Sequence, residues 1–341
     1  MKFNQTESTI EKLFLEGTVS NLAIKVCRYD KVLFEKYASK DKKIDENTLF
    51  DMASVTKILC TTTLALEAMD EKLLDPRDSV GKFFELPEDK KDLAVENLLT
   101  HTMGYGHKSL NKDHVDSKNV AEYILQIPCD DKIGIKVNYS CPGFILLGKI
   151  LEKLYGKPLD VLFEKKVTAP LKMSLTAFGG SGENLVNSNI SFDMAGVVND
   201  YNCRHLGGIC GNAGVFSCMR DLSLYVSMLL SMGSDIISRE TFEKAIKNYT
   251  EGKGESRGLG FLIADESYAQ ASGLFAPHGF GHCGHTGQSL FVDPDTGLWV
   301  IILSDATVST EKKYGKENYA EVKAMRSDLH RAIGLESLKE E

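Results

Sequence analysis

The sequence predicts an α+β protein of the α/β sandwich type, with an antiparallel sheet, terminal helices on it, and a helical region packed beside it. Three patterns in the 341 residues carry this prediction. Strand-like alternation occurs near both ends of the chain, and helical spacing of apolar residues dominates the middle. An amphipathic helical pattern also occurs at each end. The simplest arrangement joins the strands of both ends in one antiparallel sheet flanked by the terminal helices.

The N-terminal part predicts one helix followed by one hairpin. Residues 4–16 place apolar side chains among charged ones, which predicts a short amphipathic helix capped by Thr6 or Ser8. Residues 19–38 alternate apolar and polar side chains with an interruption at 28–31. This alternation predicts a β-hairpin, the first part of the sheet.

The middle of the chain, from about residue 54 to residue 232, predicts helices joined by loops. The segments with helical spacing are residues 54–74, 95–104, 143–156 and 220–233. The last three end at glycine, which readily adopts the left-handed conformation found just after a helix.

Strand patterns return after about residue 257, in "RGLGFLIA", "SLFVD" and "GLWVIILSD", and residues 316–334 predict a last helix. Residues 1–53 and 251–341 are therefore predicted to form a sheet domain. Residues 54–250 would form an inserted helical domain. Together they would make one catalytic unit with its active site in the cleft between them, where sites commonly form.

Composition excludes several function classes. The net charge of −8 and the lack of a basic cluster with aromatic residues argue against a nucleic-acid partner. No signal-peptide pattern and no run of the about 18 apolar residues that a membrane helix needs are found, so we expect a cytoplasmic protein without membrane contact. The eight cysteines form no C-x-x-C pair. We therefore expect reduced thiols, no metal and no cofactor.

Ser54 and Lys57 are the first candidate catalytic residues. They form an S-x-x-K pattern at the start of a long apolar helix, and residues i and i+3 share a helix face. A lysine with a lowered pKa could accept the serine proton there. The tetrapeptide alone is weak evidence, because a capping serine with a chance lysine explains it equally well. The chain has this pattern at Ser39, Ser54, Ser79, Ser109 and Ser309.

Several blocks in chain order resemble the serine β-lactamase and penicillin-binding protein superfamily, in the branch of class C β-lactamases, D-peptidases and esterases. The blocks are "TLFDMASVTKIL", "ENLLTHTMG", "VNYSCPGFILLGKILEKLYGKPL", "APLKM", "LGGICGNAGVFSCMRDLSLYVSMLL" and "FGHCGHTGQSLFVDP". The resemblance implies that Ser54 is the acylated nucleophile and Lys57 its base partner. It also implies that Tyr139 passes protons, with its pKa shifted by nearby cations such as Lys57. We expect a structural role for His101 in "LLTHTMG".

The stretch "FGHCGHTGQSLFVDP" contains two candidates for the third motif of this superfamily. If His285 begins the motif, only Gln288 separates it from the next strand, which is too short for a hairpin turn. If His282 begins the motif, residues 286–288 form the turn and Gly287 can adopt a positive φ. We therefore favour His282.

In this interpretation, the resemblance implies that the backbone N–H groups of Ser54 and His285 form the oxyanion hole. Cys141, Cys283 and Gly284 are predicted to line the substrate pocket. Two of these depart from the superfamily pattern, because Cys141 stands where an asparagine is usual and Cys283 where a threonine is usual. We also consider that the two thiols face each other across the cleft.

Both departures fall on positions that handle the substrate, and a thiol is a weak hydrogen-bond donor. We therefore expect a serine hydrolase that acts through a Ser54 acyl-enzyme on an ester or a small amide. One alternative is a β-lactamase or D-amino-acid peptidase, similar to a D-Ala-D-Ala carboxypeptidase. A second is a catalytically weak binding protein on the same scaffold. A small-molecule substrate is the only partner expected, and the oligomeric state is not predicted.

Overall fold

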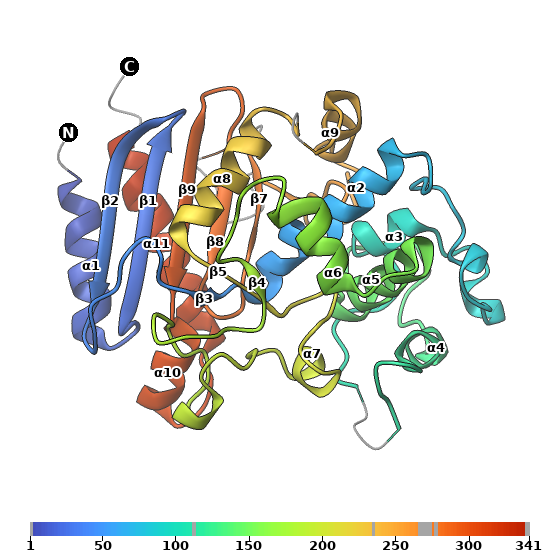
Figure 1. Ribbon diagram of the computed structural model, residues 1–341, viewed down its shortest axis with the longest axis horizontal. Helices are drawn as coiled ribbons and strands as arrows, with labels where there is room; N and C mark the ends of the chain where they lie inside the picture. The colour runs from blue at the N-terminus through green and yellow to red at the C-terminus, as the bar shows by residue number, and fades with distance from the viewer. Residues whose placement is uncertain (1–2, 111–113, 234–235, 265–274, 276–278, 338–341) are drawn as a thin grey trace.

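In a computed structural model that describes residues 3–110, 114–233, 236–264, 275 and 279–337, strands from both ends of the chain form one sheet. The described strands of this sheet lie in the order β2-β1-β9-β8-β7-β6, and every neighbouring pair is antiparallel (Figure 1). This confirms the predicted sheet. Its strands are β1 (Asn21–Arg28), β2 (Lys31–Ser39), β6 (Leu262–Ile263), β7 (Phe280–Cys283), β8 (Ser289–Val292) and β9 (Leu298–Ser304).

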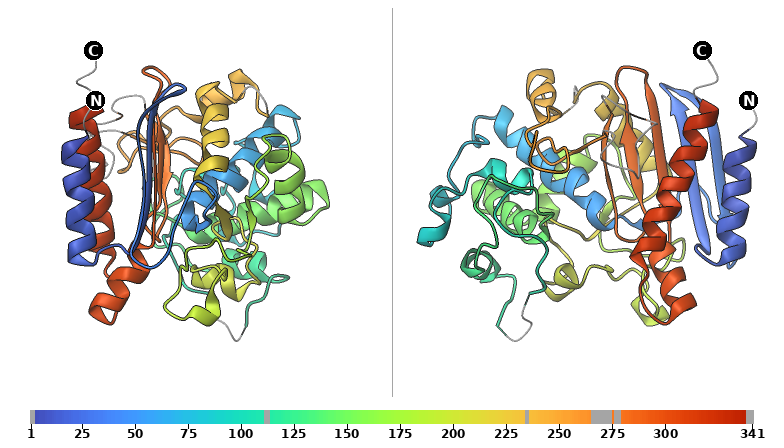
Figure 2. Two further views of the ribbon diagram at one scale, coloured as in Figure 1. Left: turned by 60° about the vertical axis from the view of Figure 1, so that its left-hand side comes forward. Right: turned by 180° about the vertical axis from the view of Figure 1, so that it is seen from behind.

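Helices α1 (Asn4–Glu16) and α11 (Tyr319–Ser337) cover one face of the sheet, as the left view of Figure 2 shows. The carboxylate of Glu336 accepts hydrogen bonds from the N–H and the hydroxyl of Thr6, at 3.0 and 2.7 Å. The predicted cap at Thr6 or Ser8 is therefore wrong. The helix begins two residues before Thr6, whose polar groups tie the two terminal helices together.

The other face of the sheet carries the helical region (Figure 2), as predicted. A second, smaller sheet runs through it in the order β3-β5-β4. A large apolar core joins both sheets to the helices. The small sheet consists of β3 (Phe50–Asp51), β4 (Ala177–Phe178) and β5 (Val215–Ser217). The helices are α2 (Thr63–Asp70), α3 (Val95–Leu99), α4 (Val120–Gln126), α5 (Cys141–Tyr155), α6 (Leu159–Phe163), α7 (Tyr201–His205), α8 (Met219–Leu230) and α9 (Arg239–Ala245), and α10 (Ala306–Tyr314) precedes α11.

The predicted helix after residue 53 is present but irregular. It begins with a 3-10 turn over Ala53–Val55 and continues as a π-helix over Lys57–Thr62 before α2. All residues of the π-helix are buried. Wide turns of this kind are rare and frequently occur at functional sites.

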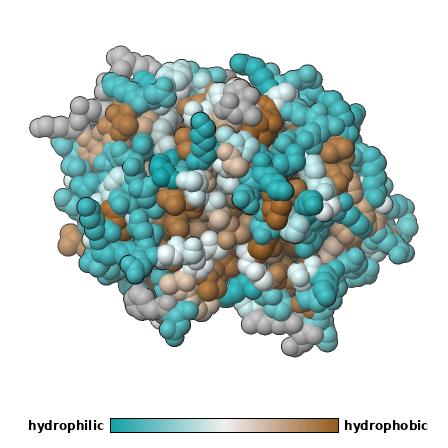
Figure 3. Space-filling model, viewed as in Figure 1, coloured by the Kyte–Doolittle hydropathy of each residue, from teal (hydrophilic) through white to brown (hydrophobic). Residues whose placement is uncertain are grey.

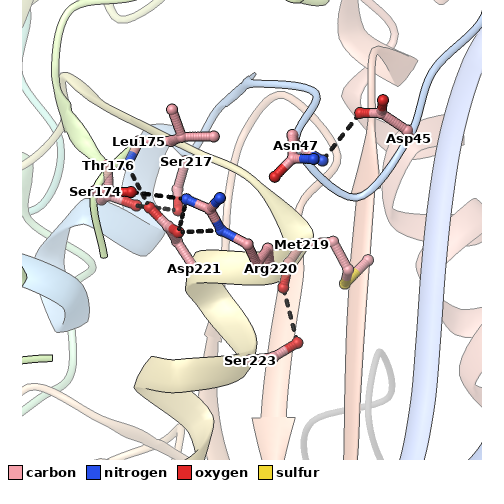
Figure 4. A network of polar contacts seen from close by, with 10 residues as sticks. All are labelled: Asp45, Asn47, Ser174, Leu175, Thr176, Ser217, Met219, Arg220, Asp221 and Ser223. Carbon is pink, nitrogen blue, oxygen red and sulfur yellow. Dashed lines mark hydrogen bonds and ion pairs between the residues drawn. The ribbon is translucent and has the colours of Figure 1, made fainter. Parts of the chain in front are cut away.

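The buried carboxylate of Asp221 stabilises the start of helix α8 (Figure 4). It accepts hydrogen bonds from the backbone N–H of Leu175 at 2.7 Å and from the hydroxyl of Thr176 at 3.0 Å. The guanidinium of Arg220 lies 2.9 Å from the same carboxylate. These contacts hold α8 against the segment that leads into β4.

The surface mixes polar and apolar residues in small patches, with hydrophilic residues prevailing at the edges of the face in Figure 3. Among the helices of the described ranges, none combines the length and the apolar character needed to cross a membrane.

Candidate active site

The sequence-predicted site residues gather around one cavity of about 890 Å³. Its wall is built from both layers of the fold: the turn that begins the π-helix, the start of α5, the end of β7 and part of α11. Lys57 is fully buried just behind this wall. Of the predicted residues, the wall contains Ser54, Tyr139, Cys141, His282, Cys283 and His285.

Ser54 lies in a strained turn, and Lys57 contacts its hydroxyl directly. The preceding Ala53 has a φ of 45°, which is unusual for a residue with a side chain. The Nζ atom of Lys57 lies 2.9 Å from the Oγ atom of Ser54 and 2.9 Å from the carbonyl oxygen of Asn212. It also lies 3.6 Å from the sulfur of Cys141. The S-x-x-K spacing therefore produces the expected contact.

The protonation of Lys57 differs from the expectation of a lowered pKa. Burial lowers the pKa of Lys57, but the neighbouring Cys141 and Tyr139 outweigh burial and raise it to about 12. Lys57 therefore holds its proton in the resting site and donates hydrogen bonds. As an ammonium group it can stabilise negative charge on Ser54 or Tyr139, and its role as the base partner of Ser54 stays a prediction.

Tyr139 lies between Lys57 and several rings. Lys57 Nζ is 5.1 Å from the centre of its ring, and the ring of His282 is 6.1 Å away between centroids. Burial raises the pKa of Tyr139, although Lys57 and a hydrogen bond from Ser54 act in the opposite direction. The expected lowering of this pKa is therefore wrong, because burial outweighs the nearby cation. Tyr139 is a neutral phenol at neutral pH.

The chain around His282 has the turn geometry expected when His282 begins the motif. Strand β7 ends at Cys283, which pairs with Ser289 on β8, and Gly287 in the intervening turn has a φ of 112°. His282 is buried in the cavity wall. Whether His282 takes part in catalysis stays a prediction.

His282 is a neutral imidazole whose ring has a defined orientation. Its Nδ1 atom lies 2.8 Å from the carbonyl oxygen of Cys283, so Nδ1 carries the proton and donates it there. Burial and the charges of Arg257 and Lys57 hold the pKa of His282 well below its usual range. Its Nε2 atom is buried and has no hydrogen-bond partner among the described residues. His282 therefore offers a hydrogen-bond acceptor to the site.

The backbone after Cys283 is held so that one N–H stays free. The guanidinium of Arg326 donates to the carbonyl of Gly284 at 2.7 Å, and the hydroxyl of Thr307 donates to the carbonyl of His285. In the described part of the chain, neither the N–H of His285 nor that of Ser54 meets an acceptor. Two free N–H groups beside the same cavity can bind an oxyanion, and this role stays a prediction for them.

Gly284 lies against the nucleophile segment instead of the cavity. A Cβ atom at Gly284 would come within 2.7 Å of the carbonyl oxygen of Met52. Only glycine permits this close approach of the two backbones. Gly284 therefore brings the turn after β7 near Ser54, and the cavity wall does not contain it.

The two candidate pocket thiols lie in different surroundings. The Cys141 sulfur is close to Lys57, whereas the Cys283 sulfur lies 3.9 Å from Ser289 Oγ and packs in the apolar cluster of the terminal helices. Successive strand residues point to opposite faces, so the Cys283 side chain points away from the face of His282. The idea that the two thiols face each other finds no support in these contacts.

Two charged residues near the site were not identified from the sequence, because neither belongs to a recognised motif. Asp51 is fully buried, and its carboxylate accepts the backbone N–H of Ala53 at 2.8 Å and of Asn199 at 2.7 Å. Burial raises the pKa of Asp51 to about 6. Arg257 is the second, and it lies in the cavity wall with its guanidinium carbon Cζ 5.5 Å from the centre of the Tyr139 ring.

Arg257 has one nitrogen that the described residues leave without a hydrogen-bond partner. Its side chain is only 3% exposed, and its Nε and Nη2 atoms bond to one carboxylate oxygen of Glu255. Its Nη1 atom is buried and meets no hydrogen-bond partner among the described residues. A buried donor without a partner is costly, so this nitrogen is suited to an anionic group of a ligand.

The described residues contain no group of three or more His, Cys, Asp or Glu side chains that could hold a metal ion.

The model of the family described as Beta-lactamase matches residues 6–324. The chain belongs to this family. It is a β-lactamase-like serine hydrolase, as the sequence blocks indicated. The family match spans nearly the whole chain, including the segments of Ser54, Tyr139 and His282.

Among curated relatives, the chain is similar to an N-acetylmuramyl-L-alanine amidase of Bacillus subtilis (strain 168). They are 26% identical over 304 residues, covering 77% of this chain and 69% of the relative. It is also similar to a putative D-alanyl-D-alanine carboxypeptidase of Escherichia coli (strain K12), with 27% identity over 308 residues, 77% of this chain and 70% of the relative.

Two solved structures share the fold. One is an octameric penicillin-binding protein homologue from Pyrococcus abyssi, with a TM-score of 0.74, 20% identity, and coverage of 93% of this chain and 78% of that chain. The other is EstCE1, a hydrolase with promiscuous acyltransferase activity, with a TM-score of 0.77, 18% identity and 97% coverage of both chains.

Proposed function

We propose that this protein hydrolyses an ester or a small amide through an acyl-enzyme on Ser54. The contact of 2.9 Å between Lys57 Nζ and Ser54 Oγ, with Ser54 in the wall of the cavity, carries the proposal. The serine oxygen would attack the substrate carbonyl while the N–H groups of Ser54 and His285 bind the developing oxyanion.

The protonation states support a relay through a neutral phenol. Ser54 would donate a hydrogen bond to the oxygen of Tyr139, and the raised pKa of Tyr139 keeps the phenol protonated at neutral pH. As the bond from Ser54 to the acyl carbon forms, the serine proton passes to Tyr139. The phenol proton passes to the leaving oxygen or nitrogen as its bond to the acyl carbon breaks. The ammonium of Lys57 stabilises the negative charge that develops between them.

Deacylation would use the same groups in the reverse direction. A water molecule attacks the acyl carbon and passes one proton to Tyr139. Tyr139 returns a proton to the Ser54 oxygen as the acyl bond to Ser54 breaks, which releases the carboxylic acid product. The acceptor atom of His282, Nε2, would accept a hydrogen bond from the water or from the phenol.

The two substitutions in the pocket favour an ester over an amide in this proposal. Cys141 beside Lys57 provides a thiol where an amide donor is usual, and Cys283 directs its thiol away from the face of His282. Amide substrates depend more on donors that hold their polar groups. Leaving such groups unpaired costs about 1–3 kcal/mol each.

A second candidate, a D-amino-acid peptidase resembling a D-Ala-D-Ala carboxypeptidase, is favoured by Arg257. Its guanidinium lies over the ring of Tyr139, and its Nη1 atom, which has no partner among the described residues, could bind the terminal carboxylate of a peptide. The names of two relatives, an amidase and a putative carboxypeptidase, also support this candidate.

Intact-mass spectrometry tests the proposal. A fluorophosphonate should add one label to the native protein, and a nitrophenyl ester should give a burst of about one equivalent of phenol. Both should be lost in Ser54→Ala and kept in Ser109→Ala, which removes another serine of the cavity wall. Unchanged labelling of Ser54→Ala would rule out Ser54 as the nucleophile. A panel of esters, D-peptides and β-lactams then separates the two candidates, and binding without any turnover would favour the non-catalytic alternative.

A further inference from the structure

His101 lies behind Tyr139 and binds the chain on both sides of it. The backbone carbonyl of His101 accepts the N–H of Asn138 at 2.8 Å. The Nδ1 atom of its side chain accepts the N–H of Ser140 at 3.0 Å. The two backbone amides that flank the catalytic candidate Tyr139 are therefore held by a single residue.

The imidazole of His101 also packs directly against the phenol ring. Its centroid lies 4.5 Å from that of Tyr139 and 5.1 Å from that of Phe144 on α5. The hydroxyl of Ser140 accepts the N–H of Gly143 at 3.2 Å and so caps α5. The position of the phenol relative to α5 is thus set through the ring and the backbone of His101.

The backbone of His101 is in an unusual conformation that makes this double contact possible. Its φ is 58°, in the left-handed region, although it is not a glycine. Strained conformations of this kind persist only where the surrounding structure holds them, and they gather at functional sites. The following residue, Thr102, is held by hydrogen bonds to Asn97 and Gly134 at 2.9 and 2.8 Å.

The hydrogen bonds define the tautomer of His101. Because Nδ1 accepts from Ser140, the proton must be on Nε2, which is buried and has no partner among the described residues. Burial, together with the charges of Arg257 and Lys57, holds the pKa of His101 well below its usual range. The side chain is completely inaccessible, so it cannot touch a substrate.

We infer that His101 is a positioning residue, which holds the phenol of Tyr139 in place against Ser54 and Lys57. This inference rests on the proposed function, in which Tyr139 relays protons. A proton relay requires donor and acceptor at hydrogen-bond distance, and a displacement of about 1 Å can lower a rate about 100-fold.

Two variants of His101 distinguish the loss of its hydrogen-bond acceptor from the loss of its side-chain volume. His101→Leu removes the acceptor and keeps an apolar group of moderate size. His101→Asn offers a carboxamide oxygen near the place of Nδ1, and asparagine tolerates a positive φ. With a nitrophenyl ester, His101→Leu should lower the acylation rate constant about 10- to 100-fold, with KM changed less than about threefold. His101→Asn should recover most of the rate, and equal rates in the two variants would overturn the inference.

A double-mutant cycle excludes a merely structural role. In the Tyr139→Phe background no phenol is left to position, so adding His101→Leu should not lower the residual acylation rate further. If His101→Leu lowers that rate by the same factor as in the wild type, the residue does not act through Tyr139 and the inference fails.

A spectroscopic measurement keeps this test separate from the proposed function. In protein labelled with ¹³C-tyrosine, the ring signal of Tyr139 is the one that Tyr139→Phe removes. We expect this signal to shift and broaden in His101→Leu and to stay near its wild-type position in His101→Asn. An unchanged signal in His101→Leu would overturn the inference, even if Ser54→Ala had already overturned the proposed nucleophile.

Discussion

The hydroxyl of Thr286 donates a hydrogen bond of 2.9 Å to the backbone carbonyl of Asp51, three residues before Ser54. The side-chain amide of Gln288 donates to the same carbonyl. The turn after β7 is thereby tied to the segment of the nucleophile. Thr286, which the sequence indicated only as a turn residue, helps hold the two halves of the predicted oxyanion hole at their distance.

Thr286→Val should therefore reduce acylation more than its position in a turn suggests. The change removes one hydrogen bond worth about 1 kcal/mol, and the same loss in the transition state corresponds to about a fivefold lower rate. Thr286→Ser keeps the hydroxyl and serves as the control. Burst kinetics with a nitrophenyl ester check the rate, and urea unfolding checks the stability. Equal rates for the valine and serine variants would contradict this role.

The protonation states predict a flat pH profile. From pH 7 to pH 9, His101 and His282 stay neutral because their pKa values are far below 6.5, and Lys57 stays protonated because its pKa is about 12. The pKa of Tyr139 is raised above 10, so the phenol also keeps its proton. We expect kcat/KM for an activated ester to change less than about twofold over this range. A tenfold rise per pH unit would instead indicate a phenolate or a neutral lysine as the base.

Arg257→Gln should distinguish anionic from neutral substrates. A hydrogen bond from a charged donor is worth about 1.5–3 kcal/mol, so KM for a nitrophenyl ester with a terminal carboxylate should rise about 10- to 100-fold. For the uncharged ester of the same length, it should change less than about threefold. Lys323→Gln, which removes another cation from the cavity wall, is the matched control. Equal effects of Arg257→Gln on both esters would mean that Nη1 does not bind the substrate anion.

Cys141→Asn should shift the enzyme toward amides. The change places a carboxamide donor beside Lys57, where the sulfur now lies 3.6 Å from the ammonium nitrogen. One recovered hydrogen bond to a polar substrate group is worth about 1–3 kcal/mol, so the ratio of anilide to ester hydrolysis should rise about 10-fold. Cys141→Ser, which is close in size to the native residue, is the control. An unchanged ratio would show that this position does not select the substrate.

Asp51 should make stability depend on pH in a defined direction. Its pKa is about 6 in the folded protein, against 3.8 ordinarily, so between these values the folded state binds more protons than the unfolded state. Stability from this group is therefore highest below about pH 4 and falls as the pH rises to about 6, by roughly 3 kcal/mol. Asp51→Asn should not show this loss of stability with rising pH, because asparagine does not titrate. The unfolding free energy of the wild type minus that of Asp51→Asn should fall from pH 4 to pH 7, and a constant difference would contradict the raised pKa.

Local sequence patterns were sufficient to predict much of the fold and one contact of the candidate site. Alternation in residues 19–38 and helical spacing in 143–156 correspond to the observed hairpin and to α5, because the period of the apolar residues matches the side-chain period of each element. The i, i+3 spacing of Ser54 and Lys57 gave their contact at 2.9 Å. The need for a turn with a positive φ predicted Gly287 in the loop after β7.

Properties that depend on distant parts of the chain were not predictable in this way. The pKa of Lys57 was expected to be lowered and is raised, because Cys141 and Tyr139 from another segment surround it. Asp51 and Arg257 carry no motif, and their importance comes only from burial and from an unsatisfied nitrogen. The sequence by itself therefore indicated the family, through its matching blocks in chain order, and determined the fold class and the contact of Ser54 with Lys57, which follow from local periodicity and spacing. The tertiary structure alone decided which groups hold protons and which residue fixes Tyr139, because burial and long-range contacts control both.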